Sequence, residues 1–323
     1  MKNKKTKTKL RTFLTWIGWA LVIQLLLVNI SASLYAYKLT HLRVNAGSTF
    51  ESAPSTNIFA RTWRLFSGPA FYKFPLTIRP SFAYSTVELK ANNNISIEAW
   101  FAKADSSPRG TVILFHGLMG NKGMIVDEAT AFHSLGYNIM MVDLRHHGNS
   151  GGDATTMGYK ESEEVKLAFD YITGSGGKNI FLWGSSAGAV AVMKAVSDYA
   201  LKPAGVVIEM PFLSLQSHLK GRARILGFPE QPFGFFTSFW IGAEQGFNGL
   251  GFKTTRYAKQ INCPVLMQYG EKDQLVLRGE TDAIFSALAS PVKKLVIYDD
   301  AGHESFLIKD PVTWHREISA FLQ

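Results

Sequence analysis

Ile180-Phe181-Leu182-Trp183-Gly184-Ser185-Ser186-Ala187-Gly188 is the stretch that decides the fold of this 323-residue chain. Its four leading apolar residues predict a buried strand, and the small residues behind them predict a sharp turn into a helix. A serine at the centre of such a turn needs small residues two positions away on both sides, because the backbone folds tightly there and exposes the hydroxyl. Gly184 and Gly188 meet that need for Ser186, whereas Trp183 would flank Ser185. The stretch therefore predicts Ser186 as a nucleophile, with a Gly/Ser-rich surface turn as the alternative.

Strands and helices alternate along the body of the chain. Short runs rich in Val and Ile predict strands buried on both faces at 111–115, 137–142, 179–183, 205–209, 264–269 and 293–298. Helices are expected at 122–135, 160–173, 187–199, 279–289 and 311–321. Two further extended segments, 84–90 and 95–102, flank Asn92-Asn93-Asn94 and predict a hairpin. This alternation predicts an α/β fold with a mostly parallel, doubly covered sheet whose functional loops meet at the carboxyl ends of the strands.

Loops at three predicted strand ends carry candidates for a proton-transfer chain. A serine hydroxyl becomes a good nucleophile when a base removes its proton and a third group orients that base. His303, in a Gly-containing loop after the last strand, is the candidate base, and His146 and His147 are its closest rivals. Asp273 follows the preceding strand and is the candidate acid, with Glu209 as the alternative.

The loop after the third predicted strand is the expected oxyanion hole. It reads His116-Gly117-Leu118-Met119-Gly120, and its glycines let a backbone N–H approach a developing negative charge. The donors are assigned to the backbone N–H groups of Leu118 and of Ala187, the residue after the nucleophile. We expect His116 to pin this loop and Met119 to line the pocket.

Taken in order, these loops resemble those of serine hydrolases of the α/β-hydrolase superfamily. The resemblance covers about residues 82–323 and rests on the turn around Ser186, the His116-Gly117 loop, Asp143-Leu144-Arg145-His146-His147-Gly148, Asp273 and Gly302-His303. It implies a cofactor-independent esterase, lipase, thioesterase or peptidase mechanism without a metal ion. In that mechanism Ser186 attacks a carbonyl, His303 carries the proton and Asp273 orients His303. The Asp-x-Arg-x-His-Gly loop is similar to that of lysophospholipase-like and serine aminopeptidase-like hydrolases.

Residues 12–37 predict a membrane anchor, because they contain no charged side chain and about 20 apolar residues suffice to cross a bilayer. The basic tail, residues 1–11, precedes this segment, so the positive-inside bias places the tail in the cytoplasm and the catalytic domain outside it. Tyr35 and Tyr37 are expected at the far membrane surface. A signal peptide cleaved near Ser31-Ala32-Ser33 is the alternative, although its usual apolar region of about 7 to 15 residues is shorter than this one.

Two segments fall outside the alternation. Residues 38–81 are interrupted by prolines and glycines and are expected to connect the anchor to the hydrolase domain through short helices. Residues 211–255 are crowded with aromatic side chains and are expected to form a lid with an apolar wall over the site, or else a small core of their own. An apolar wall favours an acyl chain or an aromatic group. Lys220, Arg222 and Arg224 would meet a phosphate or carboxylate there, unless they form a solvated helix face.

Composition and spacing exclude several classes of function. The net charge is +9, but six basic residues of the tail account for most of it, and the rest of the chain carries no basic stripe, so no nucleic-acid partner is predicted. Cys263 is the only cysteine, which excludes an internal disulfide and a cysteine-based zinc site. The glycines near Ser186 lack the lysine of a phosphate-binding loop. We expect a serine hydrolase of small-molecule or lipid-like esters; a peptidase, amidase or thioesterase with the same triad, and a non-catalytic binding protein, are the alternatives.

Overall fold

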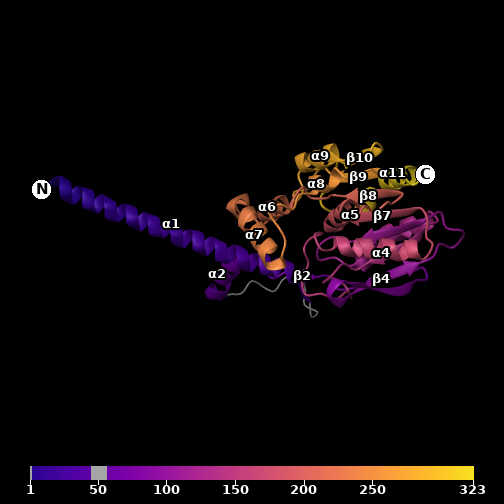
Figure 1. Cartoon of the computed structure of the whole chain (residues 1–323), viewed down its shortest axis with the longest axis horizontal. Coiled ribbons are helices and arrows are strands. Elements are labelled where there is room, and N and C mark those ends of the chain that lie inside the picture. Colours follow the sequence, from indigo (N-terminus) through magenta and orange to yellow (C-terminus); the bar gives the residue numbers. More distant parts are fainter. Residues whose placement is uncertain (1, 45–56) are drawn as a thin grey trace.

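An eight-stranded sheet forms the centre of the molecule, and a long helix projects away from it (Figure 1). The computed structural model describes residues 2–44 and 57–323. Met1 of the predicted tail and residues 45–56 of the predicted connector lie outside the described residues. The strands of the sheet are β3 (Ser85–Ala91), β4 (Ile95–Ala102), β5 (Thr111–Phe115), β6 (Asn138–Val142), β7 (Ile180–Ser185), β8 (Gly205–Glu209), β9 (Val265–Gly270) and β10 (Lys293–Tyr298).

The strands lie in the order β10-β9-β8-β7-β5-β6-β4-β3. β3 and β4 form the predicted antiparallel hairpin, and β4 pairs antiparallel with β6. All other neighbours in the sheet are parallel. β5 and β7 are adjacent, with Phe115 paired to Gly184, so the loop after β5 lies beside the turn after β7. The predicted α/β-hydrolase fold with its N-terminal hairpin is confirmed.

Helices cover both faces of the sheet. The helices are α1 (Lys2–Thr40), α2 (Ile58–Ser67), α3 (Val126–Ser134), α4 (Ser162–Gly174), α5 (Ala187–Asp198), α6 (Leu215–Ile225), α7 (Glu230–Gln245), α8 (Thr254–Ala258), α9 (Arg278–Ala287), α10 (Phe306–Lys309) and α11 (Pro311–Phe321). Val165 of α4, Val190 of α5 and Ile284 of α9 belong to one buried cluster. Phe132 of α3 and Trp314 of α11 belong to the other. The apolar strands between the two clusters are therefore buried on both faces, as their composition predicts.

The prediction of a single helix over 122–135 is wrong at the start of that segment, where the structure has no regular α-helix. A 3-10 turn, η2 (Lys122–Ile125), precedes α3. The side chain of Asp143 accepts the backbone N–H of Lys122 at 2.7 Å and also pairs with the Lys122 ammonium, which is fully buried. These bonds tie the start of the segment to the loop after β6, and the regular helix begins only after them.

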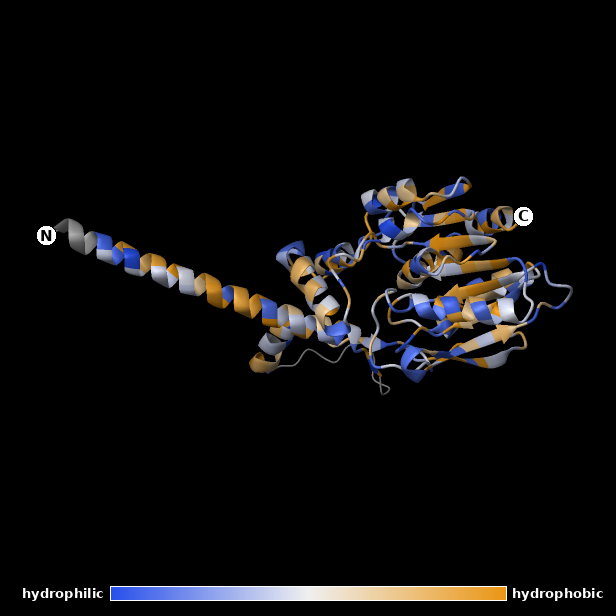
Figure 2. Cartoon of the chain, in the orientation of Figure 1, coloured by the Kyte–Doolittle hydropathy of each residue, from blue (hydrophilic) through white to orange (hydrophobic). Residues whose placement is uncertain are grey.

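One helix among the described residues, Lys7–Thr40, is long and apolar enough to cross a membrane. Its N-terminal part is hydrophilic and its middle is hydrophobic (Figure 2). The last turns of α1 pack against α2 and α7 (Figure 1). Tyr35 is only 2% exposed there, and its ring contacts Phe71 and Phe233 edge to face at 5.4 and 4.8 Å. The Tyr35 ring is therefore packed inside the protein against Phe233 of α7, whereas Tyr37 is 55% exposed.

Candidate active site

Ser186 lies on the sharp turn between β7 and α5. Its backbone has φ 52° and ψ −114°, a combination that is rare for residues other than glycine. The Ser186 N–H donates to the carbonyl oxygen of Glu209 at 2.8 Å, which fixes the turn to the neighbouring strand β8. The hydroxyl faces a cavity above the carboxyl ends of the strands, and the side chain is 7% exposed.

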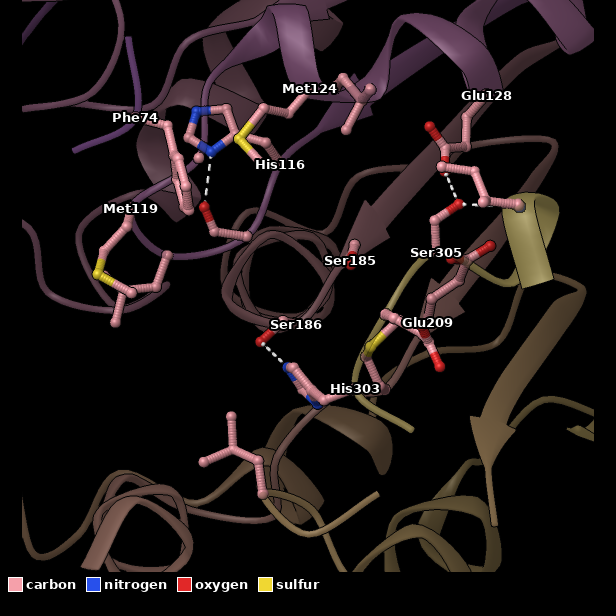
Figure 3. A pocket seen from close by; sticks show the side chains of 18 of the residues that line it. Phe74, His116, Met119, Met124, Glu128, Ser185, Ser186, Glu209, His303 and Ser305 are labelled. Carbon is pink, nitrogen blue, oxygen red and sulfur yellow. Dashed lines mark hydrogen bonds between the residues drawn. The ribbon is translucent and has the colours of Figure 1, made fainter. Parts of the chain in front are cut away.

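Ser186, His303 and Asp273 form one chain of hydrogen bonds. His303 Nε2 lies 2.9 Å from Ser186 Oγ, and the two side chains point toward each other (Figure 3). His303 Nδ1 lies 2.6 Å from Asp273 Oδ2. The other carboxylate oxygen, Oδ1, accepts the N–H groups of Leu275 and Val276 at 2.7 and 2.9 Å. The loops after β9 and β10 thus bring a fixed carboxylate, an imidazole and the serine hydroxyl together, as predicted from their order in the sequence.

Glu209, the alternative acid, lies elsewhere and has a different role. Its Oε1 accepts hydrogen bonds from Trp183 Nε1, Trp314 Nε1 and Gln268 Nε2 at 3.1, 2.9 and 3.2 Å. Burial raises the pKa of this carboxyl to about 8. Glu209 therefore links side chains of β7, β9 and α11 beside the cavity, whereas Asp273 contacts the His303 imidazole.

The rival histidines hold loops. His146 contacts the carbonyl oxygens of Gly152 and Leu42 at 2.9 and 3.0 Å. His147 is buried, and its Nε2 accepts the N–H of Met119 at 3.0 Å. The loop after β6 is thereby bonded to the loop after β5, and neither ring contacts Ser186.

His116 pins the same loop from the other side. Its Nε2 accepts the N–H of Leu144 at 3.1 Å, and its Nδ1 lies 2.7 Å from the carbonyl oxygen of Gly117. Burial lowers the pKa of this imidazole to about 4, so the ring is neutral at physiological pH. This arrangement matches the loop-holding role expected for His116.

The two expected oxyanion donors are free to bind an anion. Within the described part of the chain, no acceptor takes up the N–H of Leu118 or of Ala187. A Cβ atom on Gly117 would lie 3.4 Å from Ser186 Cβ, so the loop after β5 packs directly against the nucleophile turn. The N–H of Ala187 opens helix α5, where it has no partner within the helix. Both N–H groups therefore belong to the two segments that meet at Ser186.

The cavity in front of Ser186 has a volume of about 420 Å³. Its apolar lining comes from Phe74, Met119, Met124, Ile125, Met210, Leu275 and Ile308. Its polar lining includes Glu128, Glu209, His218, Arg222, Glu304 and Ser305. Over residues 2–44 and 57–323, no group of three or more His, Cys, Asp and Glu side chains is arranged to hold a metal ion.

Of the two alternatives for the aromatic residues of the lid, an apolar wall over the site or a small core of their own, the structure favours the core. None of the aromatic residues between 211 and 255 lines the cavity. Phe212 and Phe252 are buried beneath the lid, and Phe247 stacks on Tyr159 with ring centroids 4.1 Å apart. The lid instead contributes two polar side chains, His218 and Arg222, both from α6. His218 was not predicted from the sequence, although its spacing of four residues from Arg222 would have placed both on one face had a helix been predicted there.

Comparisons with known proteins agree with this fold. A family model described as serine aminopeptidase, S33, matches residues 106–231. The lysophosphatidylserine lipase ABHD12 of Mus musculus is 25% identical over 191 residues, which are 55% of this chain and 45% of that protein. The matched region thus spans less than half the length of that lipase. The protein YqkD of Bacillus subtilis is 24% identical over 216 residues, 66% of this chain and 70% of that protein.

Solved structures with the same fold include esterases. The Pyrococcus furiosus esterase Pf2001 superposes with a TM-score of 0.62 at 24% identity, over 75% of this chain and 92% of that one. Acetyl xylan esterase 1 from Thermoanaerobacterium superposes with a TM-score of 0.58 at 18% identity, over 76% of this chain and 84% of that one. At these identities the likeness establishes the fold.

Proposed function

Because the chain belongs to the α/β-hydrolase superfamily, we propose that it is a membrane-anchored serine hydrolase that cleaves carboxylic esters through an acyl-enzyme on Ser186. The observation that carries this proposal is the hydrogen-bonded chain Ser186–His303–Asp273, with its distances of 2.9 and 2.6 Å. A serine, an imidazole and a carboxylate in this arrangement are the groups that acyl transfer needs.

In the proposed mechanism, Ser186 Oγ attacks the ester carbonyl carbon while His303 Nε2 takes the hydroxyl proton. Asp273 Oδ2 accepts the proton on His303 Nδ1 in a hydrogen bond and so stabilises the imidazolium that forms. The carbonyl oxygen becomes an oxyanion between the N–H groups of Leu118 and Ala187, where one preorganised donor lowers the barrier by about 2.7 to 4 kcal/mol.

The tetrahedral intermediate then collapses. The bond to the leaving alcohol breaks, and His303 returns its proton to that oxygen. A water molecule next attacks the acyl group on Ser186 while His303 takes one of its protons. The acid leaves, the proton returns to Ser186 Oγ, and the free enzyme is restored.

Charge in the cavity favours an ester over a peptide with a free amino terminus. An α-ammonium group needs an ionised carboxylate beside it. Burial raises the pKa of Glu209 to about 8, so that carboxyl favours its neutral form, and burial also raises the pKa of Glu128 above its usual value. Glu304 accepts the N–H of Gly302 at 3.1 Å and lies 3.8 Å from the Lys309 ammonium, so its charge already has a partner. The apolar lining, and the similarity to ABHD12, a lysophosphatidylserine lipase, support a lipid-like acyl ester. A thioester remains the second candidate, since the same carbonyl chemistry would cleave it.

We further propose that α1 is a single-pass anchor whose basic end is cytoplasmic, so that the catalytic domain lies outside the cytoplasm. Exposed apolar side chains along α1, such as Leu21 and Leu26, support a bilayer around its middle. The end of α1 supports retention of the anchor, because Ala32 is buried and Ser31 bonds to the carbonyl oxygen of Phe66 in α2. Helix α2 exposes Ile58, Phe59, Trp63 and Leu65 beside that end, as a helix lying on a bilayer surface would.

Turnover of matched esters and amides tests the proposed activity. The purified full-length protein would be assayed with nitrophenyl esters of increasing acyl length and with nitroanilides of single amino acids. The proposal expects ester hydrolysis that is absent from Ser186→Ala. Cleavage of the amino-acid nitroanilides with negligible turnover of every ester would overturn it in favour of a peptidase.

A further inference from the structure

We infer that His218 and Arg222 of the lid helix α6 form a subsite for an oxyanion, a phosphate or carboxylate, carried by the ester substrate. This inference rests on the proposed function, since it specifies which esters the Ser186 site accepts. Both side chains line the cavity in front of Ser186. They lie four residues apart on one helix, so they share a face.

His218 is a buried polar group that lacks a partner. The residue is 2% exposed, and neither ring nitrogen has a hydrogen-bond partner in the described structure. Its ring lies against Phe212, with centroids 4.8 Å apart, and gains no polar contact there. Burial lowers the pKa of His218 well below its usual value, so the ring is neutral and one nitrogen carries an unused N–H. Nearly all buried polar groups in folded proteins are bonded, so an unused donor in a cavity wall indicates a ligand acceptor.

Arg222 is a cation without a carboxylate partner. Its guanidinium lies over the Phe71 ring at 4.8 Å from the centroid, and its Nε donates to the Tyr35 hydroxyl at 3.4 Å. Both contacts are to neutral groups, and no carboxylate among the described residues forms an ion pair with it. Arg222 is also the only arginine or lysine of the described chain that lines this cavity. Its remaining N–H groups match the planar fork that binds phosphate or carboxylate.

Arg224, two residues further along α6, provides the contrast. Its Nε pairs with Glu230 at 2.8 Å, and its NH1 donates to the carbonyl oxygen of Gln274 at 2.7 Å. Arg224 does not line the cavity. One arginine of α6 is therefore committed to holding the lid together, while the other faces the cavity with its charge uncompensated.

The acidic groups in and beside the cavity do not cancel Arg222. Glu304, in the loop after β10, accepts the N–H of Gly302 at 3.1 Å and lies 3.8 Å from the Lys309 ammonium. Burial raises the pKa values of Glu128 and Glu209, which favours their neutral forms. Asp273 is already bonded to His303 and to two backbone N–H groups. An anionic substituent on the substrate would thus meet a net positive wall at α6 while its ester carbonyl lies at Ser186.

The experiment compares esters that differ only in an anionic group, using the full-length protein in nanodiscs. One pair is oleoylglycerol and oleoylglycerol phosphate, and the other is nitrophenyl butyrate and mono-nitrophenyl glutarate. The readout is the ratio of kcat/KM for the anionic ester to that for the neutral ester. Relative to wild type, Arg222→Gln is expected to lower this ratio by about 10- to 100-fold, the effect of losing a charge-assisted hydrogen bond. His218→Leu is expected to lower it less, and Arg224→Gln, the matched control, not at all.

The two pairs separate the possible oxyanions. A fall in the ratio for the phosphate pair alone identifies a phosphate subsite, and a fall for the glutarate pair alone identifies a carboxylate subsite. An equal ratio in wild type, Arg222→Gln and Arg224→Gln would overturn the inference, as would equal losses of neutral and anionic turnover in Arg222→Gln.

Binding to Ser186→Ala separates this inference from the proposed function. Calorimetry would measure its affinity for oleoylglycerol and for oleoylglycerol phosphate, with and without Arg222→Gln. Tighter binding of the phosphate that depends on Arg222 supports the subsite even if no ester is hydrolysed. Equal affinity for the two lipids would overturn the subsite and leave the hydrolase proposal standing.

Discussion

Gly188 and Phe115 pack so closely that a Cβ atom on Gly188 would lie 2.2 Å from the Phe115 carbonyl oxygen. A Cβ atom on Gly184 would lie 2.6 Å from the carbonyl oxygen of Gly188. The two glycines around Ser186 therefore let α5 start directly against the ends of β5 and β7. This contact places the N–H of Ala187 and the loop of Leu118 next to each other.

Substituting Gly188 by Ala is predicted to destabilise the protein. The added methyl group would meet backbone atoms, and overpacking of this kind costs about 1–3 kcal/mol. For a protein of this size the Tm should fall by roughly 2 to 10 °C. Gly279→Ala in α9 is the control, because a Cβ atom there has no neighbour within 4 Å. Equal melting temperatures for the two variants would contradict this account of the turn.

Asp273→Asn is predicted to lower kcat for ester hydrolysis by about 10⁴-fold while the protein stays folded. The amide would present the wrong group to His303 Nδ1 and would no longer stabilise the imidazolium. Glu271→Gln is the control, since Glu271 is exposed and pairs with Arg278 at 3.0 Å. Steady-state rates with a nitrophenyl ester measure the effect. If Glu271→Gln lost as much kcat as Asp273→Asn, the result would contradict a specific role of Asp273 in the triad.

The sequence is sufficient to predict the sheet and the meeting of Ser186 and His303, because both follow from local patterns. The strands Gly205–Glu209 and Lys293–Tyr298 have the bounds that were predicted for them. Ser186, His303 and Asp273 follow strands of one parallel sheet, so their meeting at one edge is a consequence of topology. The choice between Asp273 and Glu209 needed the structure, since both carboxyls follow a strand and only the fold decides which one reaches His303.

The lid and the end of the anchor could not be predicted in the same way. Aromatic residues occur both in substrate pockets and in small cores, and Phe212, Phe247 and Phe252 of the lid form core contacts. Tyr35 belongs to an apolar run that predicts a membrane span, yet it packs against Phe71 and Phe233. These contacts join residues far apart in the chain, and no local period encodes them.

The stability of the protein is predicted to depend on pH through Glu209. Burial raises the pKa of Glu209 to about 8, whereas an unfolded glutamate has a value of about 4.3. At pH values between these two pKa values, the folded state therefore holds one proton more than the unfolded state. The stabilisation is fully present below the unfolded pKa and is lost as the pH rises through the folded pKa, by up to about 1.4 kcal/mol per pH unit.

Glu209→Gln should weaken this dependence, because the amide oxygen still accepts the indole N–H groups of Trp183 and Trp314 and carries no titratable proton. Melting curves between about pH 5 and pH 8 measure the effect, with Glu271→Gln as the exposed control. A decline in Tm for Glu209→Gln as steep as in wild type would show that another group controls the stability.

Helix α2 is predicted to touch the bilayer. Its Phe59 is 82% exposed next to the end of α1, whereas Val312 of α11 is 75% exposed at the opposite end of the molecule (Figure 1). An environment-sensitive fluorophore would be placed at either position by cysteine substitution in full-length Cys263→Ser protein in nanodiscs. Spin-labelled lipids are expected to quench the fluorophore at position 59 and to leave that at 312 unquenched. Equal quenching at the two positions would exclude α2 from the membrane surface.

Labelling with a fluorophosphonate probe tests most directly whether Ser186 is an activated nucleophile. The full-length wild type, Ser186→Ala and Ser185→Ala would be compared, with circular dichroism to verify folding. The account predicts that wild type and Ser185→Ala are labelled and that Ser186→Ala is not. Labelling of Ser186→Ala at the wild-type level, or a folded wild type that takes up no probe, would contradict it.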